Sequence, residues 1–457
     1  MRGSNKINHK PFLPINRQNE LKSPYICRMA PFSTGLEFEW FDYGCDGEHT
    51  VYFGKKGEEI KTALKIRESI AVLEGLEENT HYEMYIESET GGRSKTRLFR
   101  TGEIPEGCSV INYLHPEDPY YDLSGRFLGT PSMVRTDSGK LIASMDVFES
   151  FKPQNLAILF YSEDDGKSWR YLTDLFPYFW TTLFYRKGIL YALGVTTEYG
   201  DLHIACSKDE GETWSEAKTI FRGSNFSCKY GGVHKPPMQI VPYKGRLYLP
   251  CEYGCWEYGS HLPAIISISE DDDLMVPENW IMSDILPFEG EWKEKANGEQ
   301  KDTIEGNIVV APDGNLYSFM RWSVGAFLKL KINTDNPEKA PEFVDIVEAP
   351  VSNSIFRIIP KDGKYLMITN RRTEKSLKHD YWTYRNVLSV YESEDLESFT
   401  FVKDIFNRED EHPGKNGFQY PNFILEGDEI LLMVRAAFNE PDNAHNSNHM
   451  LFCKVEV

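Results

Sequence analysis

Two short stretches of the chain share one pattern, Ser162-Glu-Asp-Asp-Gly-Lys-Ser-Trp169 and Ser207-Lys-Asp-Glu-Gly-Glu-Thr-Trp214. Both fit Ser-x-Asp-x-Gly-x-(Ser/Thr)-Trp, and they begin 45 residues apart. In a tight hairpin turn, Ser and Asp side chains accept hydrogen bonds from backbone N–H groups, Gly adopts a positive φ, and Trp packs beneath. Two copies of so specific a pattern predict an internal repeat built from β-hairpins.

The repeat extends beyond these two turns. From about Gly129 onward, a hydrophobic strand, a turn with glycine, a second strand and a third strand recur roughly every 45–60 residues. The turns of the six units are TDSGK (136–140), YRKG (185–188), PYKG (242–245), APDG (311–314), PKDG (360–363) and LEGD (425–428). Four-stranded units at this period are typical of a β-propeller, whose blades bury their faces against their neighbours. We predict an all-β chain with a six-bladed propeller over 105–457, closed by a strand from 109–128.

The preceding region contains short alternating strands such as LEFEWFDY, HTVYFGKK and HYEMYIES, separated by Gly, Asn and Asp. We predict a β-sandwich over 20–104, after an N-terminal extension over 1–19. The segment Leu76-Glu-Glu-Asn-Thr-His-Tyr82 resembles the tyrosine corner of fibronectin type III domains, with Trp40 as the core aromatic. This resemblance implies an accessory module packed on or beside the propeller.

The amino-acid composition of the chain limits the classes of molecule that it can bind. The chain has 50 Lys plus Arg against 70 Asp plus Glu, a net charge of −20. This charge argues against nucleic-acid and anionic-membrane partners, and no apolar run is long enough to span a membrane. Eight dilute cysteines and a polar N-terminus favour a cytoplasmic location, or a secreted one where a signal peptide is removed. An acidic protein that binds an anion must gather its cations locally.

In a propeller, the start of each innermost strand and the end of the next strand face the central funnel. The first-strand starts are Gly129, Trp180, His234, Glu305, Asn353 and Tyr420. The second-strand ends and following loops give Asp146, Glu149, Glu198, Glu252, Arg321, Arg371, Arg372 and Arg435, and Arg385 opens a third strand. Several arginines converge, so we expect the funnel to bind an anion, most simply a carboxylate gripped in a two-point fork.

Three further segments resemble parts of the active site of one known protein superfamily. The stretch from Ile304-Glu305 to Arg321, the stretch Tyr384-Arg385-Asn-Val, and the stretch Gly417-Phe-Gln-Tyr420-Pro-Asn resemble active-site segments of the sialidase superfamily, whose propellers also carry the Ser-x-Asp-x-Gly-x-(Ser/Thr)-Trp turn. The resemblance implies a glycosidase in which Glu305 deprotonates Tyr420, whose phenolate attacks an anomeric carbon. It also implies that Arg321 and Arg385 bind the carboxylate of a terminal acidic sugar. A tyrosine nucleophile suits a substrate whose carboxylate would repel Asp or Glu.

The remaining parts of the family's site fit less directly. The family's acid/base is an aspartate after the second strand of the first blade, where this chain offers Asp146 and Glu149. The family also carries an arginine at the start of the first inner strand, where this chain has Gly129, with Arg126 three residues earlier. This departure puts sialic acid in doubt and leaves other acidic sugars open, such as uronic and ulosonic acids.

Two alternatives stay open. In a uronate-directed lyase, His234 or Tyr420 would abstract the proton α to a carboxylate while cations stabilise the enolate. The pair His234-Lys235 supports this alternative, because it lies at the start of an inner strand. In a glycan-binding propeller, the site would bind without turnover. We expect no cofactor and no metal ion, because the set His445, His449 and Asp442 matches no strong metal-binding pattern. For substrate binding we propose Arg321, Arg385, His234, Arg371, Arg435, Glu252 and Arg126, and an acidic glycan as the partner.

Overall fold

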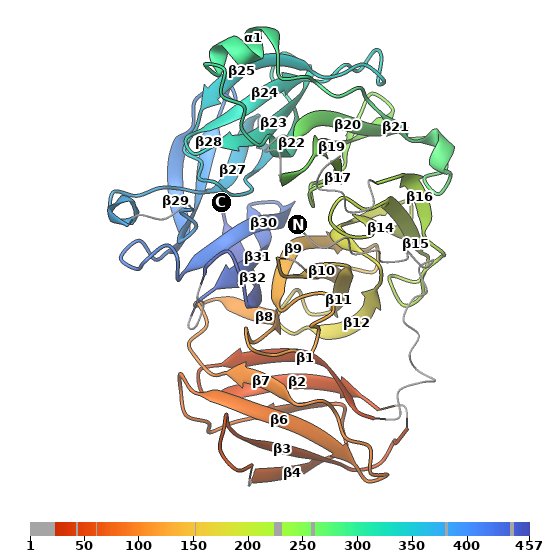
Figure 1. The fold of residues 1–457 in the computed structure, drawn as a ribbon, viewed down its shortest axis with the longest axis vertical. Coiled ribbons are helices and arrows are strands. Elements are labelled where there is room, and N and C mark those ends of the chain that lie inside the picture. The colour runs from red at the N-terminus through yellow and green to blue at the C-terminus, as the bar shows by residue number, and fades with distance from the viewer. Residues whose placement is uncertain are drawn as a thin grey trace.

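Two β-rich parts lie end to end in the computed structural model, with the N-terminal strands at one end (Figure 1). The structure describes residues 23–42, 44–60, 62–150, 152–223, 231–256, 261–379, 383–438 and 443–457. The proposed extension 1–19 lies outside these residues. The division into 20–104 and 105–457 remains our proposal.

The N-terminal part is a β-sandwich. One sheet contains β1 (Tyr25–Phe32), β2 (Gly35–Phe41) and β5 (Ile70–Leu73), and the other contains β4 (Thr62–Ile66), β3 (His49–Lys55), β6 (His81–Ser88) and β7 (Arg97–Arg100). Alternate side chains of β6 are more deeply buried, as period-two sequences require, and Trp40 is buried in the core. The Glu77 N–H donates a hydrogen bond to Tyr82 Oη over 2.9 Å. That contact fits the expected corner, while kinship with fibronectin type III remains a prediction.

Six sheets form the propeller, as the repeat predicts. Blade 1 contains β9 (Phe127–Arg135), β10 (Leu141–Phe148), β11 (Leu156–Ser162) and β12 (Arg170–Leu175); blade 2 contains β13 (Phe179–Arg186), β14 (Ile189–Val195), β15 (Leu202–Ser207) and β16 (Lys218–Phe221). Blade 3 contains β17 (Gly232–His234), β18 (Val241–Tyr243), β19 (Arg246–Gly254), β20 (Leu262–Ser269) and β21 (Ile281–Met282); blade 4 contains β22 (Ile304–Val310), β23 (Leu316–Ser323), β24 (Ala326–Lys331) and β25 (Glu342–Glu348). Blade 5 contains β26 (Arg357–Lys361), β27 (Lys364–Asn370), β28 (Val387–Ser393) and β29 (Thr400–Asn407).

Blade 6 closes the ring. It joins β30 (Gly417–Glu426), β31 (Glu429–Ala437) and β32 (His449–Glu456) to β8 (Cys108–Tyr113) from the start of the propeller. The antiparallel register pairs Cys453 with Cys108. The predicted closing strand is therefore confirmed, and it fastens the last blade to the segment before the first.

Helices are few and short among the described residues. They are α1 (Gly290–Lys295), η3 (Pro277–Asn279) and η4 (Ser376–Lys378). Within the described residues, no helix combines the length and the apolar character needed to cross a membrane.

The repeated turns hold the bonds that their sequence requires. In the first, the Gly166 N–H donates to Ser162 Oγ over 2.8 Å, and the Ser168 N–H donates to Asp164 Oδ1 over 2.9 Å. The second turn repeats these bonds at Ser207 and Asp209, and Gly166 and Gly211 both have positive φ. A degenerate third copy at Ser393 is one residue shorter, and there Leu396 has a positive φ and donates its N–H to Ser393 Oγ. Local turn chemistry thus explains why the pattern recurs between outer strands.

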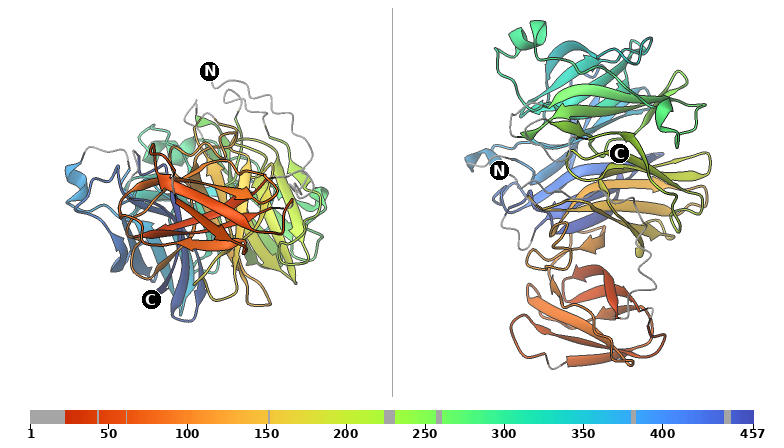
Figure 2. Two further views of the ribbon diagram at one scale, coloured as in Figure 1. Left: turned by 90° about the horizontal axis from the view of Figure 1, so that it is seen from below. Right: turned by 45° about the vertical axis from the view of Figure 1, so that its right-hand side comes forward.

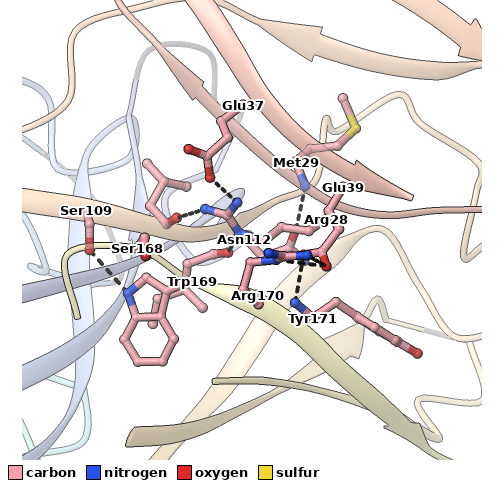
Figure 3. Close-up of polar contacts among 12 residues, drawn as sticks. Arg28, Met29, Glu37, Glu39, Ser109, Asn112, Ser168, Trp169, Arg170 and Tyr171 are labelled. Carbon is pink, nitrogen blue, oxygen red and sulfur yellow. Dashed lines mark hydrogen bonds and ion pairs between the residues drawn. The ribbon is translucent and has the colours of Figure 1, made fainter. Parts of the chain in front are cut away.

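The sandwich is fixed to the propeller by buried polar contacts (Figure 3). Arg28 donates to the carbonyl oxygens of Ile111 and Val110 over 2.8 and 3.0 Å. Glu39 accepts bonds from the Arg170 guanidinium at 3.0 Å and from the Tyr171 N–H at 2.9 Å. These contacts join the sandwich to β8 and β12, beneath blades 6 and 1 (Figures 1 and 2). Three of these four partners are backbone atoms, which cannot rotate away, so the contacts favour one orientation of the sandwich on the propeller.

One ion pair beside this interface gives a stability prediction. Arg97 Nε lies 2.7 Å from Asp118 Oδ2, and each side chain is only 1% exposed. Asp118→Asn would leave the guanidinium buried without its counterion, so the free energy of unfolding should fall by about 3–5 kcal/mol in urea denaturation. Asp122→Asn is the matched control, because Asp122 forms exposed pairs with Arg126 and Lys152 and should matter much less. Equal losses in the two variants would contradict the prediction.

Candidate active site

A cavity of about 500 Å³ lies where the inner strands of the six blades meet. Each blade contributes a lining residue near the start of its inner strand, and these residues are Thr130, Trp180, His234, Glu305, Asn353 and Tyr420. Five of the six were expected from the sequence, and Thr130 takes the place of its neighbour Gly129. The funnel-facing positions of the repeat were thus largely predictable.

Four of the inner strands bulge at these positions. The register between the first and second strands of blades 1, 2, 4 and 6 shifts beside Thr130, Trp180, Glu305 and Tyr420. All four residues have φ between 50° and 59°, a region that residues other than glycine adopt rarely. A bulge re-aims one side chain out of the alternating pattern of its strand. The same backbone device therefore delivers a different side chain to the cavity in each of the four blades.

Two of the bulge residues are hydrogen-bonded to each other across the cavity. Tyr420 Oη donates to Glu305 Oε1 over 2.6 Å. Arg321 Nη1 lies 2.6 Å from Glu305 Oε2 and 3.4 Å from Tyr420 Oη. Burial works against the charge on Arg321, but the Glu305 carboxylate raises the pKa of Arg321 above its usual value. A phenol, a carboxylate and a guanidinium thus form one cluster, in which the carboxylate is placed to take the phenolic proton.

Arg385 and Arg435 also lie beside Tyr420. Their guanidinium carbons lie 5.4 and 4.0 Å from the centre of the Tyr420 ring, and both donate to Gln419 Oε1. Burial lowers the pKa of Arg385 to about 9, and burial likewise lowers the pKa of Arg435. Arg435 is 4% exposed, its Nε atom has no hydrogen-bond partner, and no described carboxylate forms an ion pair with it. An anion that enters the cavity would compensate this positive charge.

Gly129 leaves room for Arg435. A Cβ atom at Gly129 would lie 2.9 Å from Phe148 Cδ1 and 3.3 Å from Arg435 Nη1. The position where the sialidase pattern has an arginine therefore faces the guanidinium of another arginine, which comes from blade 6.

His234 belongs to an aromatic wall formed by blades 2 and 3. Its Nδ1 atom lies 2.7 Å from Glu252 Oε2, and Trp180, Trp256 and His261 contact its ring. Burial, followed by the positive charges of His261 and Arg321, lowers the pKa of His234 well below its usual value. Burial and the nearby Glu305 raise the pKa of Glu252. At neutral pH the imidazole is therefore uncharged, with Glu252 behind it.

The lowered pKa of His234 predicts a pH effect on stability. The folded chain binds fewer protons at His234 than the unfolded chain does, so His234 favours folding above about pH 6.5 and loses this effect as the pH falls. Relative to His234→Gln, the wild-type free energy of unfolding should drop by about 1.4 kcal/mol per pH unit below pH 6.5. Urea denaturation at a series of pH values measures the difference, and parallel curves for the two proteins would refute it.

Asp146 and Lys235 are buried outside the cavity lining. Asp146 accepts bonds from the Thr181 N–H and Oγ1, and Lys235 Nζ donates to Trp180 O, Thr182 Oγ1 and Leu193 O. Burial raises the pKa of Asp146 to about 7 and lowers the pKa of Lys235. The structure therefore places the proposed acid Asp146 outside the cavity lining, and the hydrogen bonds of Asp146 and Lys235 instead join blades 1, 2 and 3.

Four other proposed residues also lie away from the cavity lining, namely Arg126, Glu149, Arg371 and Glu252, which bonds to His234 from behind. Arg126 pairs with Asp122 at 3.0 Å and approaches Glu149 at 3.8 Å. Arg371 forms a two-point pair with Asp404, at 2.8 and 2.7 Å. Each cation is occupied by an acidic neighbour on the surface, as charged groups of an acidic protein commonly are. The arginines that line the cavity are Arg321, Arg385 and Arg435.

The final loop contributes one of its two histidines. His445 lines the cavity against Phe148, whereas His449 is buried behind it and stacks on Phe438 at 4.3 Å. Asp442 lies outside the described residues. In the described part of the chain, a group of three metal-ligand side chains within 4.8 Å occurs at Asp42, Cys45 and His49 of the sandwich.

Several lining residues were absent from the sequence-based proposals. Trp256 follows β19 and Gln154 follows β10, so both lie just past second strands, where the funnel rule already looked for charged groups. Asp302 precedes β22, and Trp322 lies on β23 beside Lys301. Searching the same positions for aromatic and amide side chains would have found Trp256 and Gln154.

Comparisons with known proteins agree with this fold. A family model described as a BNR repeat-like domain matches residues 189–433, more than half of the chain. An α-L-arabinanase of Penicillium chrysogenum, solved with arabinobiose, is 12% identical, with a TM-score of 0.50 over 77% of this chain and 98% of that one. A Hadza microbial sialidase is 13% identical, with a TM-score of 0.51 over 98% of this chain and 95% of that one. No curated protein sequence matches the chain. At these identities the solved structures establish a shared propeller fold.

Proposed function

Because this chain belongs to the family of BNR repeat-like domains, we propose that its propeller is an exo-acting glycoside hydrolase that releases a terminal carboxylated sugar. The observation that carries the proposal is the 2.6 Å hydrogen bond from Tyr420 to Glu305, inside a cavity that three arginines line. Folds of this shape occur in a sialidase and an arabinanase, so a glycosidase is the activity class that they support. The arginines favour an acidic sugar within that class.

The proposed first step is covalent. Glu305 Oε1 takes the phenolic proton of Tyr420, the phenolate oxygen bonds to the anomeric carbon, and the bond from that carbon to the leaving oxygen breaks. Arg321 holds the Glu305 carboxylate from its second oxygen, so Tyr420 and Glu305 keep their geometry while the proton moves. Water then attacks the anomeric carbon and gives its proton to the conjugate base of the acid that protonated the leaving oxygen. The bond from the anomeric carbon to Tyr420 Oη breaks, and the phenolate regains its proton from Glu305.

Protonation of the leaving oxygen requires an acid. Asp146 and Glu149 do not line the cavity, whereas Glu198 and Asp302 do. The His261 ring bonds to Asp302 Oδ1 over 2.9 Å, and Trp256 Nε1 bonds to Glu198 Oε1 over 2.6 Å. We assign the acid role to Asp302, because Trp256 and Gln154 already hold both carboxylate oxygens of Glu198.

A lyase is the second candidate, favoured by one observation. His234 is an uncharged imidazole in the cavity wall, held through Nδ1 by Glu252, which is the arrangement of a general base. It would remove the proton α to a uronate carboxylate while the arginines stabilise the enolate. The remaining alternative is a propeller that binds a glycan without cleaving it.

The test is a screen of glycans that end in sialic, glucuronic, galacturonic or ulosonic acid, followed by product analysis. Release of the intact acidic sugar supports the hydrolase. Release of an unsaturated uronate, seen by its ultraviolet absorbance, would replace the hydrolase with the lyase. Binding without any product would leave the glycan-binding reading.

A further inference from the structure

Resting on the proposed hydrolase function, we propose that Trp180, Trp256 and Glu198 form a subsite for a neutral sugar on the leaving-group side of the cleaved bond. The cavity has two walls of opposite character. Arg321, Arg385 and Arg435 come from blades 4, 5 and 6 and surround Tyr420. The facing wall, from blades 2 and 3, carries the two tryptophans and a carboxylate.

Trp256 is held rigidly at both ends. Its Nε1 donates to Glu198 Oε1 over 2.6 Å, and its backbone N–H donates to Tyr199 Oη over 3.1 Å. Its ring packs edge-on against His261 at 4.4 Å and His234 at 5.7 Å. An indole fixed in this way offers an apolar surface for the C–H face of a sugar without losing side-chain entropy when the sugar binds.

Trp180 extends this surface toward the centre of the cavity. It is the bulge residue of blade 2, and its ring lies 4.2 Å from His234 and 4.9 Å from Phe179. It occupies the position in its blade that Tyr420 and Glu305 occupy in theirs. The aromatic surface therefore begins at the ring of bulge residues and runs outward along blades 2 and 3.

Glu198 determines which sugar this wall accepts. Trp256 holds one of its carboxylate oxygens, and Gln154 Nε2 approaches the other at 3.3 Å. An ionised carboxylate accepts hydrogen bonds from sugar hydroxyls and repels another carboxylate. The arginine wall attracts the acidic sugar, and the Glu198 wall disfavours it, so the two walls orient an acidic–neutral disaccharide in one direction.

Two substrates of one acidic sugar test the subsite. We would use the glycosyl fluoride of whichever acid wild type cleaves, and the disaccharide in which that acid is linked to galactose. Trp256→Ala should lower kcat/KM for the disaccharide about tenfold, mainly by raising KM. The same substitution should change kcat/KM for the glycosyl fluoride less than about twofold, because the fluoride has no leaving sugar. Trp322→Ala removes a cavity tryptophan from the blade 4 wall and should affect both substrates by the same factor.

The outcomes separate the two proposals. If wild type cleaves neither substrate of any acid in the panel, the hydrolase function fails. If wild type cleaves both, but Trp256→Ala lowers both equally, the hydrolase stands and the subsite is overturned. A second arm compares galactose with galacturonic acid as the leaving sugar. Wild type should prefer galactose and Glu198→Gln should weaken that preference; an unchanged preference would remove Glu198 from the subsite.

Discussion

Tyr420→Phe is expected to lower kcat for the cleaved acidic glycan by at least about 10³-fold, because it removes the oxygen that would form the covalent bond. The variant keeps the aromatic ring on which Arg435 lies at 4.0 Å, so the arginine cluster should stay in place. Binding of the free acidic sugar, measured by isothermal titration calorimetry, should therefore change far less than kcat. Retained turnover would rule out the tyrosine nucleophile.

A matched control exists elsewhere in the propeller. Tyr317 Oη donates to Asp313 Oδ2 over 2.7 Å, the same kind of tyrosine–carboxylate bond, outside the cavity. Tyr317→Phe removes the same atom and should leave kcat near the wild-type value. A comparable loss in both variants would indicate general damage to the propeller and count against a specific role for Tyr420.

The blades and the closure of the ring could be predicted because they depend on residues that are close together in the sequence. Turn bonds at Ser162 and Ser207 depend on residues within eight positions of each other, and repetition multiplies the signal. The closing strand β8 could be predicted because the last unit lacked a partner and the segment before the first was unused. The position of the sandwich could not be derived, because contacts such as Arg28 with Ile111 join residues 83 positions apart.

The position of Asp146 shows why the site was harder to predict. The sequence places it near the end of a second strand, but the strand continues to Phe148, and alternation together with the bulge turns Asp146 toward Thr181 of the next blade. A shift of one residue decides which face a side chain occupies. Only the register of the folded sheet contains that information.

The arginines show the same limit. Arg321 and Arg435 pair with Ile304 and Gln419, the residues just before the bulges at Glu305 and Tyr420. Arg371 follows the end of β27 and instead meets Asp404 of the same blade. The sequence places all three arginines at the ends of second strands. The bulges distinguish Arg321 and Arg435, which reach the cavity, from Arg371, which does not.

If the proposed hydrolase function holds, Arg435→Met should remove the expected preference for acidic over neutral substrates. Arg435 is a buried cation whose Nε has no hydrogen-bond partner, and no described carboxylate forms an ion pair with it, so the carboxylate of a substrate would be its counterion. Losing one partner of a buried charge pair costs about 2–5 kcal/mol, which corresponds to roughly 30- to 5,000-fold in kcat/KM for the acid. The methyl ester of the same sugar has no charge to bind and should be much less affected. Arg371→Met is the control, because its guanidinium pairs with Asp404 outside the cavity lining.

A substitution at Gly129 tests the same role of Arg435 independently. A Cβ atom there would press on Phe148 at 2.9 Å and on Arg435 Nη1 at 3.3 Å, so Gly129→Ala should displace the guanidinium without changing its charge. We expect a smaller loss for the acid, about tenfold, and again little change for the ester. If Gly129→Ala and Arg435→Met both leave the ratio of acid to ester unchanged, Arg435 does not bind the carboxylate. If only Arg435→Met changes it, Arg435 binds the anion but does not depend on the space at Gly129. A change in both variants would mean that this chain, lacking the first-blade arginine, binds its anion with an arginine from blade 6 in the space that a glycine leaves.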